Sequence, residues 1–570
     1  MPMTAHLATT ERDQVLTQLQ QILGVQHVLT QDHQTRFYRQ GRRYGSGAVW
    51  AVIVPGTLLQ QWRALQLLIA ADCIVIMQAA NTGLTGGSTP FGDDYDRPVV
   101  IISTRRLTGI QVIANGEQVI CLPGATLDAL EQCLAPYQRE PHSVIGSSCI
   151  GASILGGVCN NSGGALLRRG PAYTELALYA QVNAEGQLVL VNHLGIQLGA
   201  DPEQILSRLE QGDYQPDDIE YPTQRVASDQ RYADDVVQVD ADSPARFNAD
   251  PSRLFEASGS AGKVCVFAVR LDSFAKVASQ VFYLGSNDPN DLTEIRRYLL
   301  TALPRLPIAG EYIHREAYDI GAKYGKDSFL FIEKMGTAKV PAAFAMKDKV
   351  DGYLERIGLA GLSDKVLQWL TACLPNHLPQ RMNQFRDRFE HHLILRIEQQ
   401  DVAQVQHYLQ DYFAQHPQGD FFLCSTDEGR KAFLHRFAIA GAAIRYRDTH
   451  RHSVADIVAL DIALKRNDRQ WVEQLPAEME QHILHKLYYG HFFCHVFHQD
   501  YIVKKGVDPL AMEHQMWALL DARGAEYPAE HNVGHLYVAK PALQQHYRQL
   551  DPQNCFNVGI GQSSKHKHWH

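Results

Sequence analysis

Residues 146–164 read Gly146-Ser-Ser-Cys-Ile-Gly-Ala-Ser-Ile-Leu-Gly-Gly-Val-Cys-Asn-Asn-Ser-Gly-Gly164, and they constrain the architecture more than any other part of the chain. Six glycines are interspersed here with small polar and β-branched residues. Glycine lets a backbone approach a ligand closely and adopt positive φ, and an ordinary core segment needs neither property. A loop that packs on itself is the alternative interpretation. We interpret the stretch as a backbone cradle for a ligand.

A second glycine-rich stretch lies earlier in the chain and reads Gln78-Ala-Ala-Asn-Thr-Gly-Leu-Thr-Gly-Gly-Ser-Thr-Pro90. It directly follows a predicted strand. Successive exposed N–H groups form a concavity that binds anions, and the Thr and Ser hydroxyl groups add donors, so a pyrophosphate suits this loop. No lysine follows the glycines and the spacing G-x-G-x-x-G is absent, which excludes an NTPase P-loop and an NAD-binding fingerprint.

The hydrophobic patterns around both stretches predict an α+β fold. A helix is expected within about the first thirty residues, and apolar strands then alternate with amphipathic helices. The predicted strands are 50–55, 73–77, 99–103, 118–122, 176–182, 188–191 and 264–271, and the predicted helices are 58–71 and 127–134. Residues 141–171, rich in glycine, are predicted as loop, and residues 196–245, rich in acids and proline, as a polar excursion.

The composition is that of a globular protein with room for about three or four domains. Of the 570 residues, 45% are hydrophobic and 20% are charged. The formal net charge of −9 argues against general nucleic-acid binding, which depends on neutralising phosphates. Ten cysteines without a C-x-x-C pair predict buried free thiols in a reducing compartment. Because neither a secretory signal nor a membrane span is visible, we expect a soluble or peripheral protein of cytosolic origin.

The two glycine-rich stretches, together with Gly259-Ser-Ala-Gly-Lys-Val-Cys-Val266, resemble the FAD-binding domain of the vanillyl-alcohol oxidase and p-cresol methylhydroxylase (PCMH) superfamily. The resemblance implies a PCMH-type FAD-binding domain of two subdomains over residues 1–272. It further implies an α+β cap domain over 273–520 and a return to the FAD-binding domain over 521–570.

The same resemblance implies a bound FAD and its contacts. Many members attach FAD covalently through a histidine of the first loop, whereas this chain has Ala79 to Thr82 there, so we expect non-covalent FAD. The implied contacts are Ala79, Ala80, Asn81, Thr82, Gly83, Gly87, Ser88, Gly146, Ser153, Gly163 and Val266.

Further stretches resemble the family of bacterial quinone-dependent D-lactate dehydrogenases, and the resemblance covers essentially the whole chain. These stretches are 78–90, 139–153, 170–175, 433–437 and 490–506. The resemblance implies oxidation of D-lactate to pyruvate by hydride transfer to flavin, with the electrons passed to membrane quinone. It also implies peripheral attachment to the cytoplasmic face of the inner membrane. Two alternatives stay open: a dehydrogenase of another D-2-hydroxy acid, such as 2-hydroxyglutarate or glycolate, and a flavin-containing membrane adaptor without turnover.

Two histidine clusters are candidates for the chemistry. Oxidation of a 2-hydroxy acid needs a cation or metal for the carboxylate, a base for the hydroxyl proton, and a C2 hydrogen that faces the flavin. His491 and His498, followed by Glu530-His531, resemble an H-x6-H…E-H pattern of related flavin dehydrogenases. The pattern implies that His531 is the base and that the other three residues hold the substrate, directly or through a divalent metal. We assign no metal, and buried structural histidines are the alternative.

The segment 315–390 mixes basic and aromatic side chains and is the best candidate for contact with an anionic phospholipid surface. We expect it to be helical. Acids are interspersed, so its net charge is only slightly positive, and a solvated, charged helical face is the alternative. Its basic residues include Lys323, Lys326, Lys334, Lys339, Lys347, Lys349, Lys365, Arg381, Arg386 and Arg388.

Overall fold

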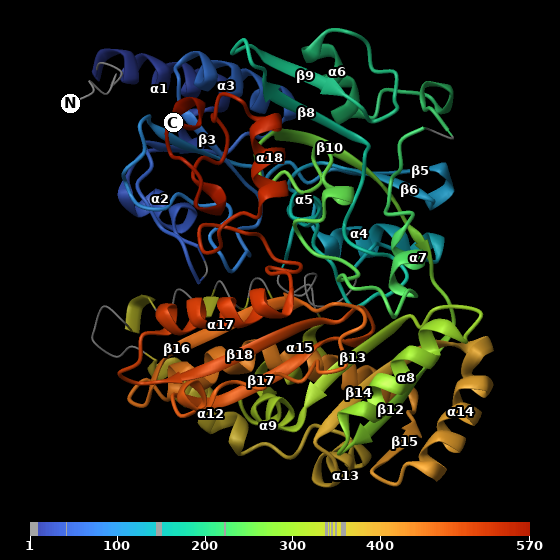
Figure 1. Ribbon diagram of the computed structural model, residues 1–570. Coiled ribbons are helices and arrows are strands. Elements are labelled where there is room, and N and C mark those ends of the chain that lie inside the picture. The colour runs from blue at the N-terminus through green and yellow to red at the C-terminus, as the bar shows by residue number, and fades with distance from the viewer. Residues whose placement is uncertain are drawn as a thin grey trace.

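The computed structural model describes residues 9–41, 43–143, 151–221, 224–336 and 361–570, and the positions 340, 343, 346, 347, 350 and 352–354. Figure 1 shows an upper and a lower body. The chain builds the upper body first and the lower body second, and its last part crosses back, so that both ends lie in the upper body. The mixture of helices and strands confirms the predicted α+β class.

The upper body contains two large sheets and a two-stranded antiparallel sheet of β7 and β11. A four-stranded sheet has the order β1-β2-β4-β3, with β4 parallel to β2 and β3, and a five-stranded antiparallel sheet has the order β5-β6-β10-β8-β9. The strands are β1 (Val28–Leu29), β2 (Ala51–Ile53), β3 (Ile74–Gln78), β4 (Val99–Ser103), β5 (Ile110–Ile113), β6 (Gln118–Cys121), β7 (Arg139–Glu140), β8 (Ala177–Val182), β9 (Leu188–Asn192), β10 (Cys265–Asp272) and β11 (Phe274–Ala275). The helices are α1 (Thr9–Leu23), α2 (Asp32–Arg39), α3 (Leu58–Ala70), α4 (Leu127–Leu134), α5 (Ile154–Cys159), α6 (Pro202–Gln211) and α7 (Tyr232–Val236).

The predicted strands and helices of this body are confirmed to within two residues at most of their ends. Threonine N-caps explain why two helices begin where they do: the side chains of Thr57 and Thr126 accept the third N–H of α3 and α4 at 3.1 and 3.3 Å. Strand β5 was not predicted, because its four side chains are all only half-buried and give little apolar contrast.

Two loop predictions were wrong. The glycine-rich region 141–171 contains α5, which starts at Ser153, whose hydroxyl accepts the Gly156 N–H. The polar region 196–245 contains α6 and α7, and α6 buries Ile205, Leu206 and Leu209. The acidic composition hid the start and stop signals of α6 from the prediction. This helix begins after the N-cap Asp201 with a proline and ends at Gly212, which has a positive φ.

Seven antiparallel strands, in the order β15-β12-β14-β13-β17-β18-β16, form the centre of the lower body. Helices α9 and α15 cover one face of this sheet, and α8 and α14 cover the other. The strands are β12 (Ser279–Ser286), β13 (Ala309–His314), β14 (His391–Glu398), β15 (Gly419–Leu423), β16 (Val454–Ala463), β17 (Ile483–His491) and β18 (Val496–Lys504). The helices are α8 (Pro289–Thr301), α9 (Arg315–Tyr324), α10 (Lys326–Met335), α12 (Leu362–Ala372), α13 (Gln380–Arg388), α14 (Val402–Gln415), α15 (Thr426–Thr449), α16 (Ala477–Glu480) and α17 (Pro509–Arg523).

The predicted helical segment 315–390 contains α9, α10, α12 and α13, but its surface is less basic than expected. Lys326 is buried and donates to a backbone carbonyl oxygen. Other basic residues of the segment pair with acids: Arg381 with Glu428, Arg386 with Asp319, Arg388 with Asp420, and Lys347 with Asp364. Lys339 and Lys349 lie outside the described residues. Large apolar side chains instead lie exposed, namely Met335, Met346, Val350, Tyr353, Leu362, Val366, Trp369, Leu370 and Leu374.

The chain returns to the upper body through α18 (Pro541–Leu550) and ends beside β3. The carboxylate of Asp551 accepts the backbone N–H groups of Cys555 and Phe556 at 2.9 and 2.7 Å. This turn places Phe556 in a parallel bridge with Val75 of β3. Phe556 is fully buried, so the late segment completes the core of the earliest sheet.

The described cysteines are all free, as predicted, but not all are buried, because Cys133 and Cys373 are exposed. Cys149 lies outside the described residues. Among the described helices, none has both the length and the apolar character that crossing a bilayer requires.

Replacing the late core residue tests how strongly the return segment supports the upper body. We expect Phe556→Ala to lower the free energy of unfolding by about 3–5 kcal/mol, because it removes a fully buried ring and leaves a cavity. Urea unfolding followed by tryptophan fluorescence measures this change. Val538→Ala, at an exposed position of the same segment, is the matched control and should change stability little. Equal effects of the two substitutions would contradict the prediction.

Candidate active site

The first glycine-rich loop is anchored by hydrogen bonds from its own side chains to neighbouring backbone carbonyl oxygens. The Gln78 amide donates to the carbonyl oxygens of Tyr38 and Ser88 at 2.8 and 2.7 Å. The Asn81 amide donates to the Gln40 carbonyl at 3.0 Å, and Asn81 itself has a φ of +52°. The backbone between these anchors is therefore fixed before any ligand binds.

The second loop and the third glycine element meet at α5. The Gly259 N–H donates to the carbonyl oxygen of Val158, and the Ala261 N–H donates to that of Cys159. The side chain of Asn557, from the return segment, donates to the Gly87 carbonyl at 2.9 Å. Hydrogen bonds thus join all three glycine-rich elements and the return segment around one space.

That space is a cavity of about 1550 Å³. It is lined by the predicted cofactor residues Ala79, Ala80, Asn81, Thr82, Gly83, Gly87, Ser88, Ser153, Gly163 and Val266. Gly146 lies outside the described residues. Two features fit a bound dinucleotide: a Cβ on Gly83 would meet no described atom within 4 Å, and the buried side-chain oxygen of Asn160 has no described hydrogen-bond partner. The cradle has room and polar capacity for FAD.

The opposite wall of the cavity is one face of the seven-stranded sheet. Successive side chains of a strand point to opposite faces, so residues two apart share a face. Asp461 shares its face with Ala459, whereas Leu460 packs into the core on the other side. Glu311, His491 and His498 lie on the same face, at neighbouring strands, and all line the cavity.

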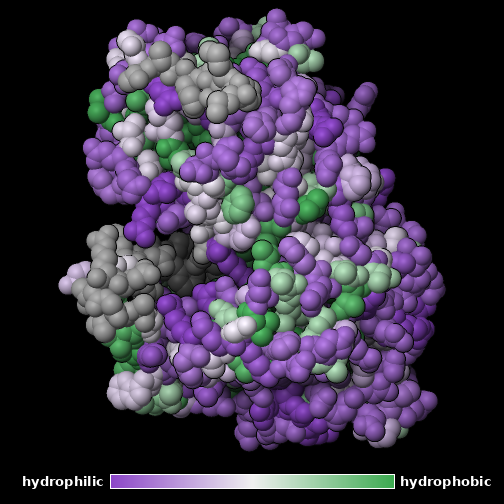
Figure 2. Space-filling view, turned by 60° about the vertical axis from the view of Figure 1, so that its left-hand side comes forward, coloured by the Kyte–Doolittle hydropathy of each residue, from purple (hydrophilic) through white to green (hydrophobic). Residues whose placement is uncertain are grey.

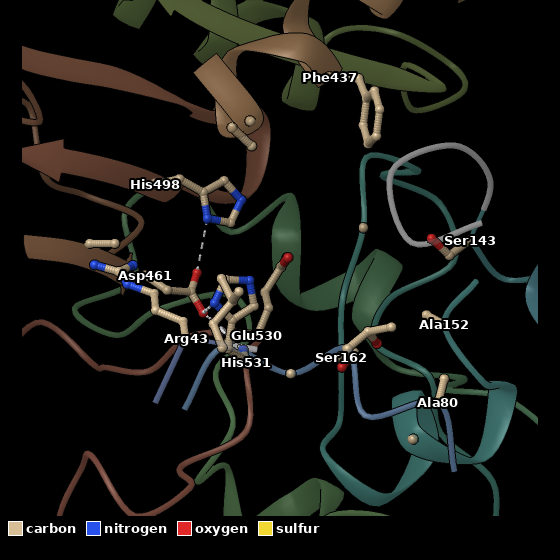
Figure 3. A pocket seen from close by; sticks show the side chains of 18 of the residues that line it. Arg43, Ala80, Ser143, Ala152, Ser162, Phe437, Asp461, His498, Glu530 and His531 are labelled. Atoms are coloured by element: carbon tan, nitrogen blue, oxygen red, sulfur yellow. Dashed lines mark hydrogen bonds and ion pairs between the residues drawn. The ribbon is translucent and has the colours of Figure 1, made fainter. Parts of the chain in front are cut away.

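Asp461 is the centre of this wall (Figure 3). One carboxylate oxygen accepts the backbone N–H groups of Glu530 and His531 at 2.7 and 2.9 Å. The imidazoles of His498 and His531 lie 3.4 and 3.6 Å from the carboxylate. Burial raises the pKa of Asp461, but the two imidazoles outweigh it and hold the pKa below its ordinary value. The carboxylate therefore stays ionised and positions both histidines.

His491 lies between two carboxylates. Its Nδ1 is 2.6 Å from Glu311, and its Nε2 is 3.4 Å from Glu530. Burial lowers the pKa of His491, but Glu311 and Glu530 together raise it to about 10. Arg246 pairs with Glu530 and Arg436 with Glu311, so the buried charges alternate in sign. His491 is an imidazolium whose two nitrogens both face carboxylates.

The histidines differ in their access to the cavity. The side chain of His531 is 41% exposed, whereas those of His491 and His498 are 13% and 15% exposed. The rings of His498 and His531 stack with centroids 5.6 Å apart. Of these three imidazoles, His531 is therefore the most accessible from the cavity. The neighbouring His495 and His535 are buried and face backbone carbonyl oxygens, which makes them structural.

The four predicted catalytic residues are brought together, and their donor atoms also form two groups compact enough to hold a metal ion. One group is Asp461, His498 and His531, and the other is His491, His498 and Glu530. The geometry is therefore compatible with both alternatives, in which these residues contact the substrate directly or through a metal ion.

Three residues of the site were not predicted: Asp461, Glu311 and Arg246. Each is a buried charge, and the first two interrupt apolar strands, at Ala459-Leu-Asp461-Ile-Ala463 and Ala309-Gly-Glu311-Tyr-Ile313. A buried charge costs several kcal/mol unless it is paired, so a lone acid in a predicted core strand is the signal that identifies such residues.

Comparisons with known proteins agree with this geometry. A family model described as D-lactate dehydrogenase, membrane binding, matches residues 281–569. The chain is 55% identical to a quinone-dependent D-lactate dehydrogenase of Escherichia coli (strain K12), over 99% of each chain. It is 54% identical to the protein of that description from Haemophilus influenzae, over 98% of this chain and 99% of the relative. It is 46% identical to the quinone-dependent D-lactate dehydrogenase of Corynebacterium glutamicum, over 98% of this chain and 99% of the relative.

Solved structures share the fold at low sequence identity. p-Cresol methylhydroxylase with substrate bound has a TM-score of 0.59 and 11% identity, with 98% of both chains covered. 4-Ethylphenol oxidase from Gulosibacter chungangensis, in complex with isoeugenol, has a TM-score of 0.58, 11% identity and the same coverage. These likenesses confirm the predicted PCMH-type fold.

The charge of His491 predicts a pH-dependent stability. Because its pKa is raised to about 10 from an unfolded value near 6.5, its ion pairs stabilise the fold fully below about pH 6.5, and this contribution is lost as the pH rises to about 10. Glu311→Gln removes one flanking charge and lowers that pKa. Between about pH 7 and pH 10, the unfolding temperature of the chelator-treated parent should therefore fall more steeply than that of the variant.

Differential scanning calorimetry across this pH range measures both slopes. Glu390→Gln removes a partly exposed partner of Arg315 and serves as the control, whose slope should match that of the parent. Parallel slopes for the parent and Glu311→Gln would show that Glu311 does not hold the charge on His491.

Proposed function

The chain belongs to the family of quinone-dependent D-lactate dehydrogenases, and on this premise we propose that it oxidises D-lactate to pyruvate on a bound FAD and passes the electrons to a membrane quinone. One observation carries the proposal: a single cavity is lined both by the glycine-rich cradles and by His531, Glu530, His491 and His498. Cofactor and acid–base groups thus share one enclosed space.

The cofactor is held by the first loop, the second loop and Val266, through the residues predicted from the sequence. When bound, the flavin supplies the acceptor for the hydride that leaves C2 of the substrate. We propose that the attachment is non-covalent, because Ala79 to Thr82 offer no histidine where many superfamily members have one.

His531 takes the hydroxyl proton of the substrate. Its Nδ1 lies 3.6 Å from the ionised Asp461, so Nε2 is the nitrogen left for the substrate. The carboxylate stabilises the imidazolium that forms when the proton arrives, as in other base–carboxylate pairs. His498 stacks on the ring and limits its rotation, so its role is to position the base.

The substrate carboxylate needs a cation, and Arg43 is the candidate. Arg436 also lines the cavity and Arg246 lies buried behind its wall, but they are already paired with Glu311 and Glu530. Arg43 lines the cavity, donates to the backbone carbonyl of Ile457, and forms no ion pair with any described carboxylate. Guanidinium groups bind carboxylates in a bidentate manner, which leaves C2 directed to the flavin side.

We propose that the FAD-binding domain ends at residue 272, that the cap domain covers residues 273–520, and that the chain then returns to the FAD-binding domain.

We also propose that the lower body binds the cytoplasmic face of the inner membrane through α12. The matched family model supports a membrane-binding role. Helix α12 turns Asp364 inward, where it pairs with Arg445, and turns Trp369 and Leu370 outward. A helix with buried charges and exposed apolar residues suits a lipid surface better than water, and anionic headgroups add attraction for nearby lysines.

An absorbance spectrum tests the enzymatic proposal. The purified protein should be yellow, release its flavin on acid precipitation, and bleach on anaerobic addition of D-lactate. His531→Gln should keep the flavin but bleach roughly 10²–10⁴-fold more slowly, because the base is lost. His482→Gln, at an exposed position outside the cavity, is the control. Bleaching of His531→Gln at the parental rate would exclude His531 as the base.

A substrate panel in the same assay distinguishes D-lactate from its alternatives. Faster bleaching by D-2-hydroxyglutarate or glycolate would assign the enzyme to another D-2-hydroxy acid. No bleaching by any 2-hydroxy acid would leave the non-catalytic membrane adaptor.

Membrane attachment has its own test. We expect Trp369→Ser to weaken sedimentation with vesicles of phosphatidylglycerol and phosphatidylethanolamine by roughly ten- to a hundredfold, since burying a large apolar side chain contributes about 1.5–3 kcal/mol. Lys334→Glu should have a smaller effect that disappears at high salt. Parental binding of Trp369→Ser, together with complete release at high salt, would show that the attachment is electrostatic alone.

A further inference from the structure

The cavity extends beyond the cofactor cradle along one face of α15. The side chains of Phe433, Phe437, Ala440 and Ile444, together with Gly441, line it. They recur three and four residues apart and therefore form one stripe on the helix. Phe437 projects into the cavity on the side of Ser143 (Figure 3). At 1.5 Å per residue, the stripe is about 16 Å long.

The facing wall of this extension is also apolar. It consists of Phe331 and Ile332 from α10 and of Leu362, Val366 and Leu367 from α12. Both helices pack on α15. We call the space between this wall and the α15 stripe the α15 channel.

The α15 channel joins two different environments. Its inner end lies beside Phe433 and Arg436, which both line the cavity. Arg436 pairs with Glu311 on the seven-stranded sheet, in the wall that carries the histidines. Its outer end lies among Leu362, Val366 and Ile444, whose side chains are exposed. Figure 2 shows the molecule hollowed between the upper and lower bodies. The channel therefore leads from the cofactor to the apolar surface of α12.

The cavity has room for a further ligand beside the cofactor and the small substrate. Ligand pockets are typically about 300–1,000 Å³ for one bound molecule, and this cavity measures about 1550 Å³. The α15 stripe and its facing wall are aliphatic and aromatic, and the charged side chains that line the cavity from the same helices, Asp327, Arg430 and Arg445, are held in ion pairs. A planar ring with a long hydrocarbon tail therefore matches the apolar stripe better than a small hydroxy acid does.

We propose that the α15 channel is the quinone site: the quinone ring enters from the membrane side, stops at Phe433 and Phe437 next to the flavin, and leaves its isoprenoid tail along α15 and α12. This inference rests on the proposed function and names the place where the second substrate binds. Each turnover removes two electrons and two protons from the hydroxy acid. The quinone takes up two electrons and two protons and becomes the quinol, so the exchange balances without another reactant.

Gly441 allows the channel to be blocked without disturbing the fold. It is an α15 residue with helical backbone, it lines the channel, and a Cβ built on it meets no described atom within 4 Å. Gly441→Leu therefore fills the passage rather than the core. Ala414→Leu, at an exposed position of α14 outside the cavity and away from α12, adds a similar apolar volume as the matched control.

The test uses the full-length holoenzyme on vesicles that contain a long-chain ubiquinone. Gly441→Leu should lower kcat/KM for the quinone about tenfold or more, equivalent to about 1.4 kcal/mol. Anaerobic bleaching by D-lactate, turnover with a water-soluble dye, and vesicle binding should match those of the parent and of Ala414→Leu. Phe437→Ala should raise KM for the quinone about three- to tenfold, since an aromatic contact contributes about 0.5–1.5 kcal/mol.

The outcomes distinguish a wrong quinone site from a wrong enzymatic function. Parental quinone turnover in both Gly441→Leu and Phe437→Ala overturns the channel while leaving the proposed function intact. Loss of vesicle binding in parallel with quinone turnover means that the channel holds a lipid chain rather than the quinone, and also overturns the assignment. Failure of the parent to bleach with any 2-hydroxy acid overturns the proposed function itself.

Discussion

A single buried carboxylate connects the two bodies of this protein. Asp461 projects from β16 of the lower body and accepts the N–H groups of Glu530 and His531, which lie on the chain that returns to the upper body. An ionised carboxylate away from water is tolerated only when hydrogen bonds and opposite charge compensate for its lost hydration. Two amides and two imidazoles do so here. The interaction that places the return segment is therefore also the one that places the base.

The rest of the catalytic wall obeys the same constraint. Arg246, Glu530, His491, Glu311 and Arg436 follow one another with alternating charge across three parts of the chain. Breaking one pair leaves a neighbour buried without compensation, so the set holds only one arrangement. Such a wall is rigid, and rigidity suits hydride transfer, which requires the substrate to be held in one orientation.

The sequence identifies the cradle better than the wall. Glycine-rich stretches have few alternative uses, and their resemblance to a known flavoprotein superfamily names the cofactor residues, of which those that are described line the cavity. Glu311, Asp461 and Arg246 join the site only through strand register and long-range packing, which local patterns do not encode. The ion pairs of segment 315–390 escape local patterns for the same reason: Arg381 and Arg388 pair with Glu428 and Asp420, which lie far along the chain.

The parallel bridge between Val75 and Phe556 has a consequence for biosynthesis. A ribosome produces β3 early and Phe556 only after the whole seven-stranded sheet has emerged. Strands β1 to β4 can pair as soon as they are made, but the outer edge of β3 stays without this late partner until residue 556 has been synthesised. Nascent chains of this protein thus carry an unfinished strand edge for most of translation, which is the period when chaperones protect such edges.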